Sequence, residues 1–282
     1  MVSFANKNQL RQRAAVALLS LLLGAGLPAE TAAETAAETV KGAVDFPSSH
    51  PQRVLFVGNS YFYYNDSLHS HVRRMLLEWQ EGQDRNYQYK SATISGGRLA
   101  QQPIAHFLTP GKLGIEPAIE LLIAQGHSTA MLSEAGQAEF MAAARGHLQT
   151  AQQRGVDMAL YMTPAYVAPH KRADPGATAL IAAGYTAAGR ALGIPVIPVG
   201  LAFDAAYKSR PELALHKDFD GSHPSLAGTY LAAAVVMASI YRAPLDDIGY
   251  DYFGALPAQD AAFLRMVASS VVQDYFQREA LQ

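Results

Sequence analysis

Cysteine is absent from the sequence. Its absence excludes disulfide bonds, thiolate metal sites, a cysteine nucleophile and a lipid attached to a mature N-terminal cysteine. Charge is also scarce, since charged residues make up 16% of the chain and the formal net charge is −2. Proteins that bind nucleic acid or an anionic membrane surface usually carry an excess of Lys and Arg. We therefore expect neither nucleic acid nor a membrane surface as a partner.

The sequence also lacks the signature motifs of metal and cofactor binding. It has no His-Glu-x-x-His run, phosphate-binding loop or dinucleotide-binding fingerprint. His69 and His71 lie two residues apart on an expected helix, so their side chains point to different faces and are not expected to form a metal pair. We expect no cofactor and no metal. Half of the 282 residues are hydrophobic, which is enough to bury a sizeable core in one domain with extensions.

The N-terminus is typical of an export signal. Lys7, Arg11 and Arg13 form a positive region without acidic residues, and a short apolar run follows over residues 14–27. That run is shorter than the ~20 residues that a helix needs to span a bilayer. We predict that residues 1–29 are a signal peptide and that the mature chain is periplasmic or secreted, without stable membrane insertion. A retained signal anchor is the alternative.

A low-complexity segment follows. Residues 29–40 read AETAAETAAETV, a repeat of Ala, Glu and Thr without large apolar side chains. Segments of this composition cannot bury a core. They usually form tethers or frayed helices outside a folded domain. We predict a linker over residues 30–50 and a folded domain over residues 51–282.

Short apolar runs alternate with helical patterns through the rest of the chain. Expected strands cover 54–57, 88–95, 119–124, 157–162 and 194–200, and expected helices cover 67–81, 98–108, 134–155, 176–192, 226–241 and 258–278. This alternation predicts an α/β protein with a five-stranded parallel sheet covered by helices on both faces. Pro195 and Pro198 favour an edge position for the last strand, because proline cannot donate to a central ladder. The ligand site should lie beyond the carboxyl ends of the strands.

Ser60 occupies a bend between a strand and a helix. The apolar run at residues 54–57 is typical of a buried strand, and Gly58 ends it with a turn just before Ser60. A hydroxyl at such a bend stands clear of the sheet, near the positive end of a helix dipole that favours developing negative charge. This position favours a nucleophilic role, although an ordinary loop with a capping serine is the alternative.

Asp220 and His223 lie three residues apart in a later loop. Gly221 permits a tight turn there, and Ser225 can cap the helix that follows. A serine hydroxyl becomes a good nucleophile when an imidazole takes its proton, and an acceptor must hold that imidazole in one tautomer. An Asp-x-x-His pair alone is a weak signal, because such pairs also cap helices. Together with Ser60 on the same edge of the sheet, it predicts a Ser-His-Asp triad.

Three stretches resemble the conserved blocks of a known family, the SGNH (GDSL-type) hydrolases. Residues 58–60, Gly-Asn-Ser, resemble the first block, with Asn59 where most members have Asp. Residues 94–96, Ile-Ser-Gly, resemble the second block, and residues 220–224, Asp-Gly-Ser-His-Pro, resemble the last. The similarity spans about residues 53–241. It implies a three-layer α/β/α, flavodoxin-like sandwich.

The resemblance also implies roles for single residues. Ser60 would be the nucleophile, His223 the general base and Asp220 the residue that orients it. The backbone N–H groups of Ser60 and Gly96 would donate to the oxyanion. In the family's third block, usually Gly-x-Asn-Asp, the asparagine amide donates to the oxyanion as well.

The third block is where this chain departs from the family. Residues 125–128 read Gln-Gly-His-Ser, which puts His127 in the asparagine's place. An imidazole N–H can donate in the same geometry, and one oxyanion donor is worth roughly 2.7–4 kcal/mol. Gln125 is a second candidate donor. A third possibility is that His127 only packs or faces solvent.

Ser128 offers a rival nucleophile. Residues 126–130 nearly match the Gly-x-Ser-x-Gly elbow and also follow an expected strand. However, Ala130 replaces the last glycine, no His-Gly-Gly run precedes the motif, and the next helix is expected only from residue 134. We therefore expect Ser60 to be the nucleophile.

Three residues are candidate substrate contacts. Tyr61 follows the nucleophile, and Tyr166 and His170 lie in a loop after the fourth expected strand. Tyr61 could stack on a sugar ring or wall the pocket, with core packing as the alternative. The loop of Tyr166 and His170 could bind an anionic or glycan substrate, with a solvated basic loop as the alternative.

The sequence thus predicts an exported serine esterase that needs no cofactor and hydrolyses a small acyl ester. An O-acetyl group on a carbohydrate is the expected substrate, by analogy with the family and from the export signal. One alternative is a glycan O-acyltransferase with the same triad, and another is a non-catalytic glycan-binding module. The acyl group, the glycan and the oligomeric state stay open.

Overall fold

The computed structural model describes residues 43–47, 50–80 and 87–277. The predicted signal peptide over residues 1–29 lies outside the described residues and stays a prediction. Within the described part of the chain, no helix is both long and apolar enough to cross a membrane.

The centre of the fold is a parallel sheet of five strands in the order β2-β1-β3-β4-β5. The strands are β1 (Arg53–Gly58), β2 (Gln88–Thr93), β3 (Leu121–Gln125), β4 (Asp157–Tyr161) and β5 (Val196–Ile197). β1 and β3 are buried at nearly every position, as expected for strands covered on both faces. β5 forms one edge of the sheet, as its neighbouring prolines predicted. The predicted parallel sheet is confirmed.

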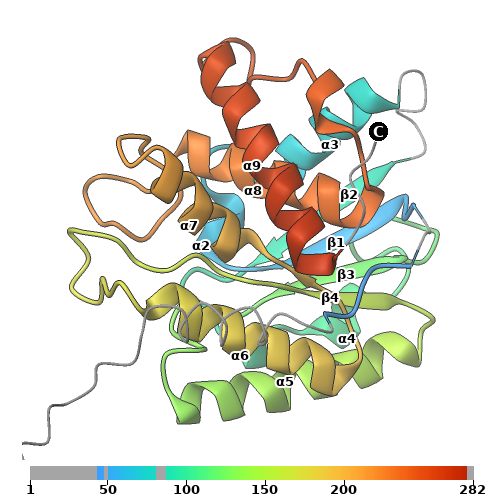
Figure 1. Cartoon of the computed structure of the whole chain (residues 1–282). Helices are drawn as coiled ribbons and strands as arrows, with labels where there is room; N and C mark the ends of the chain where they lie inside the picture. Colours follow the sequence, from blue (N-terminus) through green and yellow to red (C-terminus); the bar gives the residue numbers. More distant parts are fainter. Residues whose placement is uncertain (1–42, 48–49, 81–86, 278–282) are drawn as a thin grey trace, which may run out of the picture.

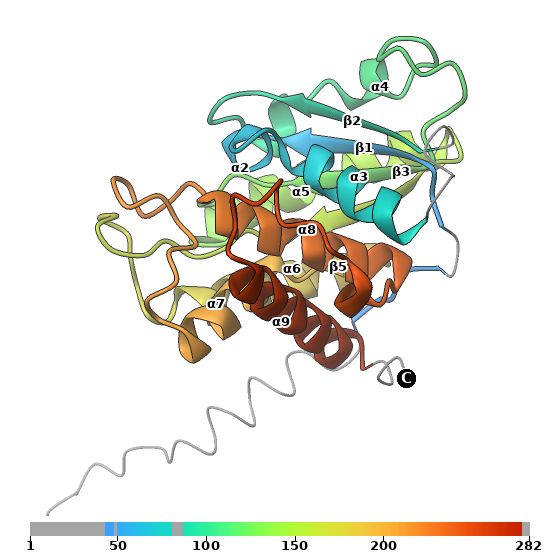
Figure 2. The ribbon, with the colours of Figure 1, turned by 90° about the horizontal axis from the view of Figure 1, so that it is seen from above.

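Helices cover both faces of the sheet, as Figures 1 and 2 show. One face carries α5 (Glu134–Gln152) and α6 (Ala177–Leu192), and the other carries α3 (Leu68–Trp79) and α8 (Leu226–Tyr241). α9 (Ala258–Phe276) packs against α8 as an additional cover. Because α8 lies between the sheet and α9, all its residues after Leu226 are buried, and its sequence is apolar around the whole helix. The predicted three-layer arrangement is therefore present.

The last predicted strand is wrong in its extent. Only Val196 and Ile197 pair with β4, and Val199 begins a helix, α7 (Val199–Ser209), which the sequence analysis did not predict. Pro198 sits at the N-cap of α7, where its missing N–H has no helical partner to lose. An apolar run of this length fits a buried strand or the start of a buried helix equally well, so its pattern alone could not separate them.

The predicted helix over residues 98–108 is also wrong as a single element. It consists of a 3-10 turn, η1 (Leu99–Gln101), and a short helix, α4 (Ile104–Phe107). Pro103 separates the two pieces, because proline lacks the N–H that a continuous helix would need there.

Part of the predicted linker packs on the domain. Phe46 is 5% exposed, and its ring meets that of Phe276 edge to face with 6.1 Å between centroids. Asp45 pairs with Arg242 at 3.1 Å. The packed part of the chain therefore includes residues 43–47, which the sequence analysis had assigned to the linker.

Candidate active site

A tight turn carries Ser60 from the end of β1 into the short helix α2 (Ser60–Tyr63). Asn59 caps α2, since its Oδ1 accepts a hydrogen bond from the backbone N–H of Tyr61 at 3.2 Å. A side chain at Gly58 would displace its neighbours, because an added Cβ would lie 2.3 Å from Gln125 Oε1 and 2.9 Å from the Phe62 ring. The turn leaves Ser60 9% exposed.

Two buried amides hold this turn in place. Gln125, at the end of β3, donates from Nε2 to Asn59 Oδ1 at 2.8 Å and accepts from the Asn59 backbone N–H at 3.2 Å. Asn59 Nδ2 donates to the carbonyl of Gly97 at 3.2 Å. Gln125 is only 1% exposed. Its amide supports the nucleophile turn, so the structure does not favour Gln125 as a second oxyanion donor.

The predicted base and its partner meet Ser60 in one line of hydrogen bonds. His223 Nε2 lies 2.9 Å from Ser60 Oγ, and His223 Nδ1 lies 2.5 Å from Asp220 Oδ2. Because Nδ1 faces a carboxylate, it carries the ring proton, and Nε2 is free to accept the serine proton. Ser60, His223 and Asp220 are thus together, as the sequence predicted for a triad.

Asp220 is held as a carboxylate. Its Oδ1 accepts hydrogen bonds from the backbone N–H groups of Ser222 and His223 at 2.8 and 3.0 Å. Burial alone would raise the pKa of Asp220, but the hydrogen bonds from the His223 ring and from these N–H groups outweigh it. The pKa of Asp220 therefore lies below its ordinary value of 3.8.

Tyr64 and Asn65, a few residues after Ser60, also position His223. The ring of Tyr64 stacks on the imidazole of His223 with 4.4 Å between centroids and 20° between planes. Asn65 Nδ2 donates to the carbonyls of Pro224 and Ser225, both at 2.9 Å. Neither contact has a sequence signal beyond the run of aromatic residues after Ser60.

The loop that carries the base rests on the loop after β4. Gly221 has a φ of +60°, and an added Cβ there would lie 2.1 Å from the carbonyl oxygen of Val167. The backbone N–H of Val167 donates to the Gly221 carbonyl at 2.9 Å. Only glycine meets both demands, the left-handed backbone and the close approach.

Three N–H groups remain as candidate oxyanion donors. No described residue accepts a hydrogen bond from the backbone N–H of Ser60 or of Gly96. His127 Nδ1 accepts from the backbone N–H of Thr129 at 3.2 Å and lies 2.8 Å from Thr129 Oγ1. The neutral imidazole therefore carries its proton on Nε2. Burial, and then the charges of Arg98 and Arg172, lower the pKa of His127, which keeps the ring neutral at neutral pH.

The expected substrate contacts differ in their exposure. Tyr61 is 5% exposed, with its hydroxyl 3.2 Å from Ser222 Oγ, so it supports the base loop from inside. Tyr166 is also buried and donates to Ser128 Oγ at 2.6 Å, and the ring of His170 stacks on it at 3.8 Å. Only His170 of these three is left partly exposed.

Ser128 is not paired with a base. Its hydroxyl accepts from Tyr166, and no imidazole of a described residue makes a hydrogen bond with it. The elbow reading of residues 126–130 therefore has no support from the geometry.

Within the described residues, no group of three His, Asp or Glu side chains is placed to hold a metal ion.

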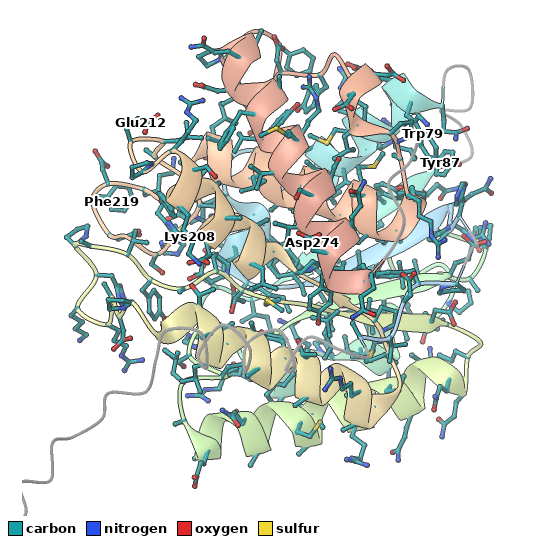
Figure 3. All side chains as sticks on the ribbon, viewed as in Figure 1. Trp79, Tyr87, Lys208, Glu212, Phe219 and Asp274 are labelled. Carbon is teal, nitrogen blue, oxygen red and sulfur yellow. The ribbon has the colours of Figure 1, made fainter. Side chains whose placement is uncertain are left out.

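Large apolar side chains stay exposed on three segments that carry site residues. Phe219, next to Asp220, is 68% exposed and lies at the outer end of its loop in Figure 3. Tyr63 and Ile94, near Ser60 and Gly96, are more than a third exposed. The surroundings of the site are therefore partly apolar.

The parallel sheet in the order β2-β1-β3-β4-β5, covered by helices on both faces, has the fold of the SGNH hydrolases. A DUF4886 family protein from Bacteroides uniformis superposes with a TM-score of 0.59 at 16% identity, over 81% of this chain and 96% of that one.

Two further solved structures are similar. A protein from Slackia heliotrinireducens, provisionally designated an SGNH hydrolase, has a TM-score of 0.52 at 20% identity, over 67% of this chain and 98% of its own. A catalytic mutant of the acetylxylan esterase Axe2 from Geobacillus stearothermophilus has a TM-score of 0.52 at 14% identity, over 68% and 96%. No protein-family model and no curated protein sequence matches the chain. At these identities the likeness establishes the fold alone.

Proposed function

We propose that the protein is a serine esterase that transfers an acyl group from an ester to water through an acyl-enzyme on Ser60. The observation that carries this proposal is the line of hydrogen bonds from Ser60 Oγ through His223 to Asp220, at 2.9 and 2.5 Å. A serine hydroxyl needs a neutral imidazole within hydrogen-bond reach and an acceptor that orients it, and this line supplies both.

The reaction begins with attack of Ser60 Oγ on the ester carbonyl, while its proton passes to His223 Nε2. The charge that develops on the carbonyl oxygen is stabilised by the N–H groups of Ser60 and Gly96 and by His127 Nε2–H. The C–O bond to the alcohol then breaks, and His223 returns the proton to the departing alcohol. Water attacks the acyl-enzyme in the same way, and the carboxylic acid leaves. Asp220 stays ionised and stabilises the imidazolium throughout.

The acyl group is proposed to be small, with acetyl on a carbohydrate as the leading case. Two of the structurally similar proteins are described as acetylxylan esterases, which supports this class of substrate. The predicted signal peptide, followed by a low-complexity segment, supports a site of action outside the cytoplasm, where such glycans occur.

A fluorophosphonate probe tests the nucleophile. Labelling should be present in the wild type and lost in Ser60→Ala, while the matched control Ser128→Ala, a serine on the same edge of the sheet, stays labelled. Labelling that survives Ser60→Ala and disappears in Ser128→Ala would contradict the proposal.

The substrate is tested by release of acetate from acetylated oligosaccharides and from p-nitrophenyl acetate. Transfer of acetyl to an added glycan at the expense of water would make the protein an O-acyltransferase. Export is tested by N-terminal sequencing of the protein isolated from cell fractions. The exported protein should begin after residue 29.

A further inference from the structure

A groove of about 780 Å³ is lined in part by Thr129, the hydrogen-bond partner of His127. It lies between the starts of α5 and α6, and its lining includes Arg98, Leu132, Glu139, Arg172, Asp174 and Leu180. Its volume falls within the range of about 300–1,000 Å³ that is usual for small-ligand pockets. A small acyl group cannot fill a space of this size, so the groove has room for the other part of an ester.

The groove and His127 share neighbouring residues. A smaller hollow of about 10 Å³ is lined by His127 together with Arg98 and Glu139, and these two charged residues also line the groove. The charges of Arg98 and Arg172 both act on His127 and lower its pKa, which agrees with their placement beside it. A molecule whose ester carbonyl faced His127 would therefore have part of the groove lining, Arg98 and Glu139, close by.

The charges of the groove are balanced. Arg98 pairs with Glu139 across the gap between η1 and α5. Asp174 Oδ1 accepts from the backbone N–H of Gly176 at 2.7 Å, and no ion pair of the described residues includes Arg172. With two guanidinium and two carboxylate groups, the lining does not select for a ligand of either charge.

The lining also carries an apolar surface. Leu180 is 46% exposed, and Leu132 lines the groove beside it. A sugar ring combines hydroxyl groups, which Arg and carboxylate side chains bind through strong charge-assisted hydrogen bonds, with C–H faces that pack on leucine. A neutral saccharide therefore matches both parts of the lining.

We propose that this groove binds neutral sugar residues next to the esterified one, on the alcohol side of the ester. The kinetic consequences of this inference rest on the proposed esterase function. Binding of oligosaccharides to the groove can be measured independently of ester hydrolysis. Sugar binding in the groove makes the protein selective for acylated oligosaccharides over acylated monosaccharides.

The kinetic experiment compares acetylated xylo-, manno- and cello-oligosaccharides of increasing length with p-nitrophenyl acetate. kcat/KM should rise with chain length in the wild type. Arg172→Ala should lower kcat/KM on the longer oligosaccharides about tenfold or more relative to p-nitrophenyl acetate, the effect of losing one hydrogen bond to a charged group. Leu180→Asp should lower the same ratio, because it removes the apolar surface on which a sugar face packs. Two matched controls should behave as wild type: Lys171→Ala, next to Arg172 but outside the groove, and Met266→Asp, an exposed apolar residue on α9.

The binding experiment uses the same oligosaccharides without acetyl groups and isothermal calorimetry with the Ser60→Ala protein. Binding that is weakened about tenfold by Arg172→Ala, and not by Lys171→Ala, supports the groove even if no ester is cleaved. In that case the esterase function fails and the groove stands. Ester hydrolysis without any dependence on chain length, or tighter binding of oligogalacturonate than of every neutral oligosaccharide, would overturn the groove and leave the esterase function in place.

Discussion

Replacing His127 by Ala tests the part of the site in which this chain departs from the SGNH hydrolases that it resembles. Nδ1 of His127 is occupied by Thr129, so Nε2–H is the group left to donate to an oxyanion. Removal of one such donor costs about 2.7–4 kcal/mol of transition-state stabilisation, which is about a hundred- to a thousandfold in kcat. KM should change little, because the charge that the donor stabilises exists mainly in the transition state.

Two further substitutions make the test graded. His127→Asn supplies the amide that the family usually has and should recover much of the lost rate. Thr129→Val removes the hydroxyl 2.8 Å from Nδ1 but keeps the backbone N–H that also donates to it. The tautomer is then retained, and the loss should stay below about tenfold, the worth of one neutral hydrogen bond.

The assay is steady-state hydrolysis of p-nitrophenyl acetate between pH 5 and 8. Because the lowered pKa of His127 keeps the ring neutral at neutral pH, with its proton on Nε2, the ratio of wild-type to His127→Ala rates should not change between pH 7 and 8. If His127→Ala keeps kcat within about twofold of wild type, where one donor should contribute a hundredfold, His127 is no oxyanion donor and the backbone N–H groups act alone. A rise in KM at constant kcat would instead make His127 a binding residue.

Three more outcomes are expected. Gly221→Ala, at a φ of +60°, should lose most activity and stability. Gly146→Ala, with an ordinary helical backbone and open space around it, should instead stabilise the protein by about 0.5–1 kcal/mol. Urea unfolding of both variants measures the difference, and equal changes in the free energy of unfolding would contradict the argument. Burial lowers the pKa of His216 to about 4. As the pH falls below about 6.5, His216 is therefore protonated in the unfolded chain but stays neutral in the folded protein. The free energy of unfolding should decline by up to about 3 kcal/mol by pH 4. His216→Asn should reduce that decline, and an unchanged difference between the unfolding free energies at pH 7 and pH 4 would refute this account. Tyr64→Ala should lower kcat about three- to tenfold by removing the ring that stacks on the imidazolium of His223, and Tyr64→Phe should not; a loss in both would mean that the hydroxyl matters and not the stack.

The sheet and the triad were predictable because each depends on short, local signals. A buried strand, a glycine turn and a serine can be read within a few residues of Ser60, and the Asp-x-x-His loop is equally compact. Parallel topology then brings the carboxyl ends of the strands to one edge, which makes the meeting of Ser60 with His223 an expected result.

Other features depend on side chains that are distant in sequence, and no local pattern reports them. The hydrogen bond between the Asn59 and Gln125 amides joins positions 66 residues apart. Because of this bond, Gln125 supports the turn that carries Ser60. Tyr61 could have faced substrate or core, since tyrosine suits both, and its buried hydroxyl contact with Ser222 is a matter of tertiary packing. α7 was missed because an apolar stretch does not by itself distinguish a strand from a buried helix.

The distance along the chain between Ser60 and His223 has a consequence for the order in which the protein matures. The two residues are 163 positions apart, and Asn65 reaches across a similar span to the carbonyls of Pro224 and Ser225. A nascent chain that has emerged as far as α6 already holds β1, the nucleophile turn and the sheet partners of β1, but no base. The proposed chemistry also needs the loop of Asp220 and His223, which emerges after all five described strands. Return of activity after refolding is therefore a stricter marker of the native state than the return of helix content.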